Sequence, residues 1–150
     1  MGKRRKAREA AIQYHFWRDL QHGETPTEMD DFWEFCPATR RVKEFAQPII
    51  EGMMSHLDTV DERIKRYCEN YDFKRISPVD RNILRLAIYE MLYRDDIPPV
   101  VSINEAIELA KTFGGPDSGR FVNGILDRVK GDLTRPLREA TQPENKPSPA

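Results

Sequence analysis

The positively charged side chains at the start of the chain are the residues best suited to bind a ligand. Five of the first eight residues are cationic: Lys3, Arg4, Arg5, Lys6 and Arg8. Lysine and arginine bind phosphate oxygens, and a protein that neutralises several phosphates of a nucleic acid binds it in a strongly salt-dependent way. Removing these five from the 24 basic residues leaves 19 against 25 acidic residues, so the remainder carries a formal charge of −6. The sequence therefore predicts a basic arm, residues 1–8, on a mildly acidic body.

The arm runs into a predicted helix over residues 4–22, where Ala7, Ala10 and Tyr14 lie three or four positions apart. Cations at the start of a helix oppose its dipole, so local stability does not explain the cluster. Tyr14 and Phe16 add rings that could stack on unpaired bases. The pattern favours a nucleic-acid surface, and two alternatives stay open. One is a solvated terminus without a ligand. The other is a membrane-surface helix, which the small, alanine-rich apolar face disfavours.

The histidines and cysteines do not have the spacing of a metal site or of a disulfide framework. His15, His22 and His56 are far apart in the sequence, as are Cys36 and Cys68. We therefore expect no bound metal and two reduced thiols in the cytoplasm. No long apolar run follows the basic arm, so we expect neither a signal peptide nor a transmembrane helix.

One glycine-rich stretch, FGGPDSG at residues 113–119, superficially resembles a phosphate-binding loop. It lacks the Lys-Ser/Thr pair that completes such a loop, and no strand is predicted before it. No catalytic arrangement can be recognised in the sequence, and we expect no cofactor.

The element expected to position the binding residues is a central helix over residues 77–94. Ser77 suits the N-cap, Pro78 the first helical position and Asp80 the first turn. The rest of this helix is apolar on nearly all sides, which predicts a buried position. Its apolar residues are Ile83, Leu84, Leu86, Ala87, Ile88, Met91 and Leu92.

Three signals predict helix boundaries elsewhere. Pro48 lies inside an amphipathic stretch over residues 40–57, where it predicts a kink or a fresh helix start. Thr59-x-x-Glu62 and Ser102-x-x-Glu105 read as capping boxes that each open a helix. The sequence thus predicts an all-α fold, a compact bundle of about seven helices around the central one.

The predicted bundle occupies a single domain over residues 4–133. Four of the eleven prolines fall in the last fifteen residues, which contain almost no apolar side chains. Residues 134–150 are therefore predicted to form a disordered, proline-rich tail.

The segment from Ser77 to Val129 resembles the NusB family of bacterial transcription antitermination factors, and the likeness extends over roughly residues 3–131. It rests on VDR (79–81), LRLAIYE (84–90), INEAIELAK (103–111), Phe113-Gly114, Asp117-Ser118, FVNGILD (121–127) and the opening RRKARE (4–9). The resemblance implies an all-helical, non-catalytic protein. It implies binding of the single-stranded boxA element of ribosomal RNA leaders, together with the ribosomal protein NusE, in the elongating RNA polymerase complex with other Nus factors.

The resemblance also implies roles for particular residues. Lys3, Arg4, Arg5, Lys6 and Arg8 fall on the family's arginine-rich RNA-binding segment, and Phe16 falls where a tyrosine often lies at the RNA surface. Asp117 falls on an acidic loop position linked to RNA affinity, and Phe121, at the start of the next motif, is expected to contact the RNA as well. Asp80 falls on an acidic position linked to NusE, where glutamate is familiar, with Arg81 beside it.

From these positions we expect the Asp117 loop to lie near the arm, with the Asp80 surface separate from both. A protein–protein adaptor, whose basic arm only solubilises the chain, remains the alternative function. A helical domain of this kind also occurs fused to a ribosomal RNA methyltransferase, but this chain has no glycine-rich cofactor loop. The sequence does not decide between a monomer and a homodimer.

Overall fold

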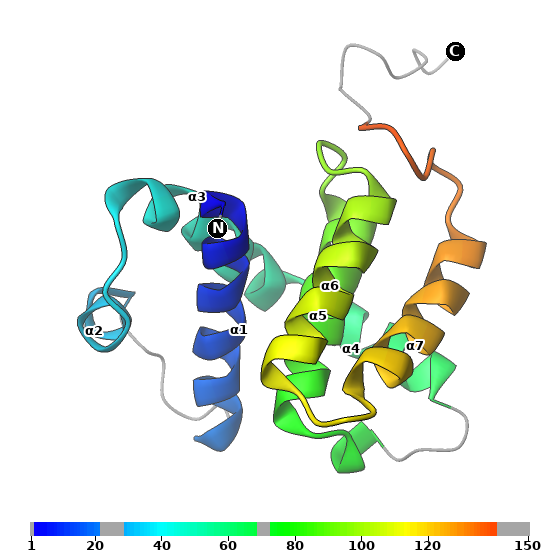
Figure 1. Cartoon of the computed structure of the whole chain (residues 1–150), viewed down its shortest axis with the longest axis horizontal. Coiled ribbons are helices and arrows are strands. Elements are labelled where there is room, and N and C mark those ends of the chain that lie inside the picture. The colour runs from blue at the N-terminus through cyan, green and yellow to red at the C-terminus, as the bar shows by residue number, and fades with distance from the viewer. Residues whose placement is uncertain (1, 22–28, 69–72, 141–150) are drawn as a thin grey trace.

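Seven α-helices and one short 3-10 helix make up the described part of the chain, residues 2–21, 29–68 and 73–140, in the computed structural model (Figure 1). This confirms the predicted all-α fold. The helices are α1 (Lys3–Leu20), α2 (Met29–Phe35), α3 (Arg40–Ser55), α4 (Leu57–Tyr67), η1 (Phe73–Arg75), α5 (Pro78–Tyr93), α6 (Pro99–Phe113) and α7 (Ser118–Asp132).

The predicted central helix is α5, which packs against α1, α3, α4, α6 and α7. Its start matches the prediction, because the Ser77 hydroxyl accepts a hydrogen bond from the Asp80 backbone N–H at 3.2 Å. From Asn82 to Met91 every residue of α5 is buried. Burial on all sides explains why this helix lacks the polar face that a surface helix needs.

The helix ends and loops of the bundle lie in two groups, one at each end of the molecule. In Figure 1 the starts of α1 and α3 lie at the top of the molecule, and α1 and α3 pack along each other. α6 also starts at the top, so the loop from α6 to α7 lies at the bottom, beside the start of α5 (Figure 1). Within the described part of the chain, none of the helices has the length and apolar character that crossing a membrane requires.

A buried charge cluster joins α1, α4 and α5. The Arg85 guanidinium donates hydrogen bonds to Asp61 at 2.8 and 2.9 Å and to Asp19 at 2.9 Å. The Asn82 amide adds a 2.9 Å bond to Asp19. Burial by itself raises the pKa of Asp19, but the charges of Arg85 and Arg81 and the hydrogen bonds from Arg85 and Asn82 together outweigh it, and the pKa lies below its ordinary value. This carboxylate therefore stays ionised and pins the end of α1 to the central helix.

Both predicted capping boxes are wrong. α4 begins at Leu57, so Thr59 lies inside its first turn. α6 begins at Pro99, whose fixed φ suits the first helical position, and Ser102 lies one turn further in. The Ser102 hydroxyl is buried and donates to Glu90 at 2.7 Å, so it serves tertiary packing and does not cap the helix.

Pro48 does not start a new helix, because α3 runs from Arg40 to Ser55 without interruption. Pro48 itself is exposed. The opposite face of α3, which includes Ala46 and Ile50, is fully buried. Packing of that face stabilises the helix across the proline.

The predicted tail begins too early, because part of it is tied to the bundle. Arg135 donates four hydrogen bonds, of 2.6–3.2 Å, to backbone carbonyls at the end of α5 and in the turn that follows it. The Val100 N–H donates to the Leu137 carbonyl at 3.0 Å. Disorder of the tail stays a prediction for residues 141–150, which lie outside the described residues.

Candidate nucleic-acid interface

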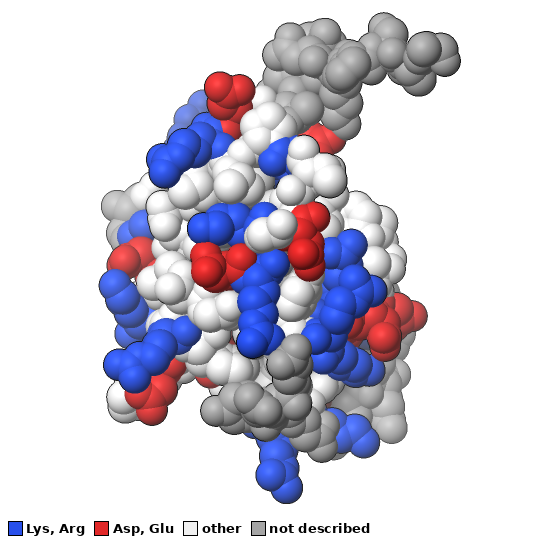
Figure 2. Space-filling view, turned by 90° about the vertical axis from the view of Figure 1, so that its right-hand side faces the viewer, with Lys and Arg blue, Asp and Glu red and all other residues white. Residues whose placement is uncertain are grey.

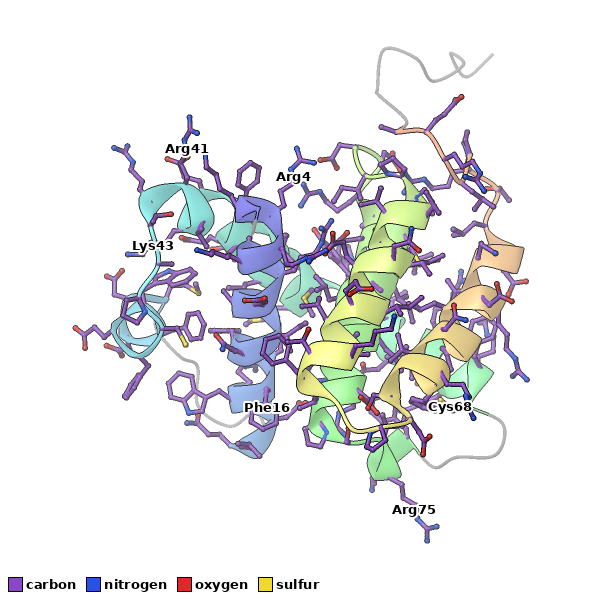
Figure 3. All side chains as sticks on the ribbon, viewed as in Figure 1. Arg4, Phe16, Arg41, Lys43, Cys68 and Arg75 are labelled. Atoms are coloured by element: carbon purple, nitrogen blue, oxygen red, sulfur yellow. The ribbon has the colours of Figure 1, made fainter. Side chains whose placement is uncertain are left out.

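The predicted basic arm is the first part of α1, which begins at Lys3 with Gly2 at its N-cap and no side-chain cap. Lys3, Arg4 and Lys6 are exposed. Figure 3 shows Arg4 at the top of the molecule, where α1 begins. Because the helix fixes their spacing, these three cations form a preorganised surface rather than a flexible extension.

Arg8 does not belong to that surface. Its guanidinium donates to the Glu90 carboxylate at 2.8 and 2.9 Å, and their side chains are 5% and 1% exposed. Ser102 completes the cluster through its bond to Glu90. The prediction that Arg8 contacts RNA is corrected on this ground, since a phosphate cannot reach a guanidinium that is buried and already bonded to a carboxylate.

Arg5 has an intermediate position. It donates to Glu105 on α6 at 2.9 and 3.1 Å, and its side chain is 35% exposed. The hydrogen bond from Arg5, together with its charge, holds the pKa of Glu105 below its ordinary value despite partial burial. Glu105, predicted as part of a capping box, therefore fastens α6 to the start of α1.

Phe16 lies over a small apolar hollow between α1, α5 and α6. The hollow measures about 140 Å³, and Ile12, Gln13, Val79 and Phe113 are among the residues that line it. Phe113 is 43% exposed, although it lies only three residues after the fully buried Ala110 on α6. It is the last residue of α6, before Gly114, and that terminal position is the signal that could have identified it. Phe16 and Phe113 thus offer two rings at one accessible site.

The Asp117 loop lies at the end of the bundle opposite the basic arm, which corrects the expectation that the two are neighbours (Figure 1). The reason is topological: α6 starts level with α1, where Arg5 bonds Glu105, and carries the chain one helix length away before the loop. Asp117 precedes α7 as its N-cap residue but makes no capping hydrogen bond with its side chain. Instead, the Ser118 hydroxyl accepts a bond from the Gly115 N–H at 2.9 Å.

Asp80 and Asp117 line the same hollow, which measures about 420 Å³ and also includes Arg75 and Phe121. The predicted separation of the partner surface from the Asp117 loop is therefore wrong. One carboxylate oxygen of Asp80, Oδ1, is buried and makes no hydrogen bond within the described residues. Such an oxygen can bind a cationic group of another molecule or accept a hydrogen bond from it.

Arg81, predicted beside Asp80 at the partner surface, points into the bundle. It donates to Asp19 at 3.2 Å, and its side chain is only 14% exposed. The structure therefore assigns Arg81 to the buried cluster around Asp19. No group of three or more histidine, cysteine, aspartate or glutamate side chains in the described ranges could hold a metal ion.

The sequence matches the profile of the NusB family over residues 5–130. It is 41% identical to the transcription antitermination protein NusB of Myxococcus xanthus over 140 residues, which cover 91% of this chain and all of that protein.

Two solved structures are similar along nearly their whole length. NusB of T. maritima superposes with a TM-score of 0.77 at 39% identity and covers 88% of this chain and 93% of its own. The antitermination factors NusB and NusE in complex with double-stranded RNA give a TM-score of 0.77 at 25% identity, over 89% of this chain and 99% of that one.

Proposed function

The chain belongs to the NusB family, and we propose that it is an RNA-binding transcription antitermination factor that acts by binding alone. It binds the boxA-type single-stranded RNA of ribosomal RNA leaders together with the ribosomal protein NusE. The pair then joins the elongating RNA polymerase complex with other Nus factors in the cytoplasm. No cofactor takes part.

The observation that carries this proposal is the similarity of the whole chain to proteins with this role. The relative from Myxococcus xanthus, all of which is covered, is a transcription antitermination protein, and a structural neighbour forms a complex with NusE and RNA. The arrangement of exposed cations and rings described above gives that role a physical basis.

For the RNA, the contacts are divided along α1. Lys3, Arg4 and Lys6 bind phosphates. The exposed part of the Arg5 side chain adds a weaker contact, because its guanidinium is also bonded to Glu105. Phe16 lies about 18 Å further along, at a rise of 1.5 Å per residue from Arg4. With Phe113 it offers rings on which unpaired bases stack, a contact worth about 1–3 kcal/mol per base.

For NusE, the contact is the hollow that contains Asp80. A cationic side chain of the partner that reaches the unpartnered Oδ1 would relieve a buried, unsatisfied acceptor. Asp117 and Phe121 on the rim of the same hollow lie within reach of both ligands, and their assignment to RNA is retained as a proposal. RNA and NusE would then bind on adjoining surfaces, so each stabilises the surface that the other needs.

The RNA part is tested by titrating a labelled boxA-type strand into the full-length chain and into a variant with Lys3→Ala, Arg4→Ala and Lys6→Ala. For a single strand, the slope of log K against log salt is about −0.7 per neutralised phosphate, so removing three contacts should flatten it by about 2. Unchanged affinity and slope would refute the role of these cations. A duplex of the same sequence serves as competitor, because stacked bases cannot reach Phe16 and Phe113.

The partner part is tested by titrating purified NusE with the Asp80→Lys variant in the presence of nuclease. The reversal should weaken NusE binding while the helical circular dichroism spectrum stays unchanged. Glu62→Lys, at an exposed site on α4, is the control with the same charge change. Binding of NusE that is unaffected by Asp80→Lys removes Asp80 from the interface. Full NusE binding without any RNA binding would favour the adaptor function.

A further inference from the structure

The start of α3 carries a second group of cations that the proposed RNA contacts do not include. Arg40, Arg41 and Lys43 lie in its first turn, which contains no acidic residue. Positive charge at this end of a helix opposes the helix dipole, as it does at the start of α1. Neither helix start is therefore explained by its own stability.

The two basic helix starts adjoin each other in space. α1 and α3 pack along each other, and Figure 3 shows Arg4 and Arg41 at the same end of the molecule. The Arg4 guanidinium carbon lies 5.4 Å from the centre of the Phe45 ring. Arg41 and Phe45 are four residues apart on one helix, so their side chains share a face. The surface thus continues from Arg4 across the exposed Phe45 ring to Arg41.

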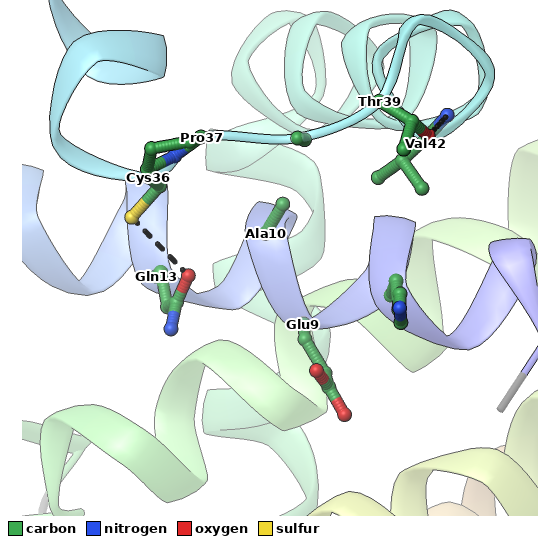
Figure 4. Close-up of a pocket in the computed structure, with 9 residues that line it drawn as sticks. Glu9, Ala10, Gln13, Cys36, Pro37, Thr39 and Val42 are labelled. Atoms are coloured by element: carbon green, nitrogen blue, oxygen red, sulfur yellow. Dashed lines mark hydrogen bonds between the residues drawn. The ribbon is translucent and has the colours of Figure 1, made fainter.

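A hollow of about 340 Å³ runs between α1 and the loop that leads into α3 (Figure 4). Its walls include Lys6 and Gln13 on one side and Thr39 and Val42 on the other. Glu9 is the one carboxylate among its lining residues, and Figure 4 shows Glu9 pointing away from the loop. The concave surface between the two cationic groups therefore carries little negative charge.

Ion pairing within the protein leaves these cations available. Arg40 contacts Glu44 at 3.3 Å, but the two side chains are 93% and 63% exposed, and such pairs contribute little to stability. Lys43 lies over the Trp33 ring at 5.6 Å from its centre, an arrangement that leaves the ammonium charge in place. By contrast, the face formed by α4 and α7 shows lysines and arginines interspersed with acids (Figure 2).

We propose that the start of α3 extends the RNA-binding surface. Arg40 and Arg41 contact two phosphates of the strand that the arm binds, and Phe45 stacks on a base between the arm and these arginines. This inference rests on the proposed function, because it takes the strand on Lys3, Arg4 and Lys6 as its starting point. It adds a binding surface on the N-terminal half of the fold, away from the Asp80 hollow. The strand would pass over the helix ends rather than along α1 alone.

The test is a salt series of RNA titrations with the variant Arg40→Gln/Arg41→Gln, using a boxA-type single strand that has flanking nucleotides on both sides. Two lost phosphate contacts should flatten the slope of log K against log salt by about 1.4 and weaken binding about 25-fold at 0.1 M salt. Phe45→Leu should weaken binding without changing the slope, because it removes a ring and no charge. A matched control is Lys65→Gln/Arg66→Gln, two exposed cations on α4.

The outcomes separate this inference from the proposed function. A double variant that binds like the unmodified chain, while the arm variant is weakened, overturns the α3 extension and leaves the proposed function intact. An equal loss for the α4 control also overturns the extension, because the effect would then be one of net charge. If the unmodified chain does not distinguish the boxA-type strand from a scrambled one and the arm variant binds equally well, the proposed function itself fails.

Discussion

Replacing Arg8 with methionine should destabilise the fold and leave the RNA surface in place. The substitution keeps an unbranched, apolar side chain of similar length and removes the guanidinium. Glu90, whose side chain is 1% exposed, would then lose its two hydrogen bonds of 2.8 and 2.9 Å and keep only the one from Ser102. The change therefore isolates the buried ion pair from the exposed cations beside it.

The expected loss of stability follows from the burial of both Arg8 and Glu90. Removing one member of a buried ion pair costs about 3–5 kcal/mol, because the other charge stays behind without compensation. That is a large part of the 5–15 kcal/mol by which a domain of this kind is typically stable. With a urea m-value of about 2 kcal/mol/M, the midpoint of unfolding should fall by about 2 M.

The assay is urea unfolding followed by circular dichroism, with RNA affinity measured separately under conditions where each variant is folded. Lys6→Met, at an exposed position two residues away, is the control and should change stability by no more than about 0.5 kcal/mol. The double variant Arg8→Met/Glu90→Gln removes both charges and should recover much of the loss, since no buried charge then lacks its partner.

Two results would refute this reasoning. A loss of less than about 1 kcal/mol for Arg8→Met would mean that the Arg8–Glu90 ion pair does not stabilise the fold. A loss of RNA affinity at unchanged stability would return Arg8 to the RNA interface and show that the pair opens when RNA binds.

Three further predictions concern other parts of the fold. Burial lowers the pKa of His15 from 6.5 to about 4; the unfolded chain then binds more protons below pH 6.5, so His15 should cost up to about 3 kcal/mol of stability as the pH drops from 6.5 to 4, and in urea titrations His15→Leu should lose less stability over this range than the unmodified chain. Asp117→Asn should strengthen RNA binding in a titration by removing repulsion of phosphate, whereas weaker binding would mean that the carboxylate bonds the RNA. Gly52→Ala should lower the thermal midpoint, because an added Cβ would overlap the Tyr89 ring, while Gly124→Ala, with open space around it, should raise the midpoint.

The sequence predicted the central helix well because its signals are local. A serine N-cap, a proline at the first position and a largely apolar surface each act within a few residues, and the structure has all three in α5. The two capping boxes misled for the same reason. Ser/Thr-x-x-Glu also occurs inside helices, and whether Ser102 caps α6 or bonds Glu90 depends on contacts across the fold.

The roles of individual charges were harder to predict because they depend on distant partners. Arg8 and Glu90 are 82 positions apart, and Arg5 and Glu105 are 100 apart, so no local pattern separates these arginines from Lys3 and Lys6. The place of Asp117 was missed because it follows from the direction of α6 rather than from any property of its loop.

Recognition of boxA-type RNA by this chain together with NusE can be measured in one titration series. A labelled boxA-type strand and a scrambled strand of equal length are each titrated with the full chain, with and without purified NusE. We expect the boxA-type strand to bind at least about tenfold more tightly than the scrambled strand, or by about 1.4 kcal/mol, with a further gain when NusE is present. By linkage, the RNA must raise the affinity for NusE by the same factor. Equal binding of both strands, with no effect of NusE, would show that the chain does not recognise boxA-type RNA together with NusE.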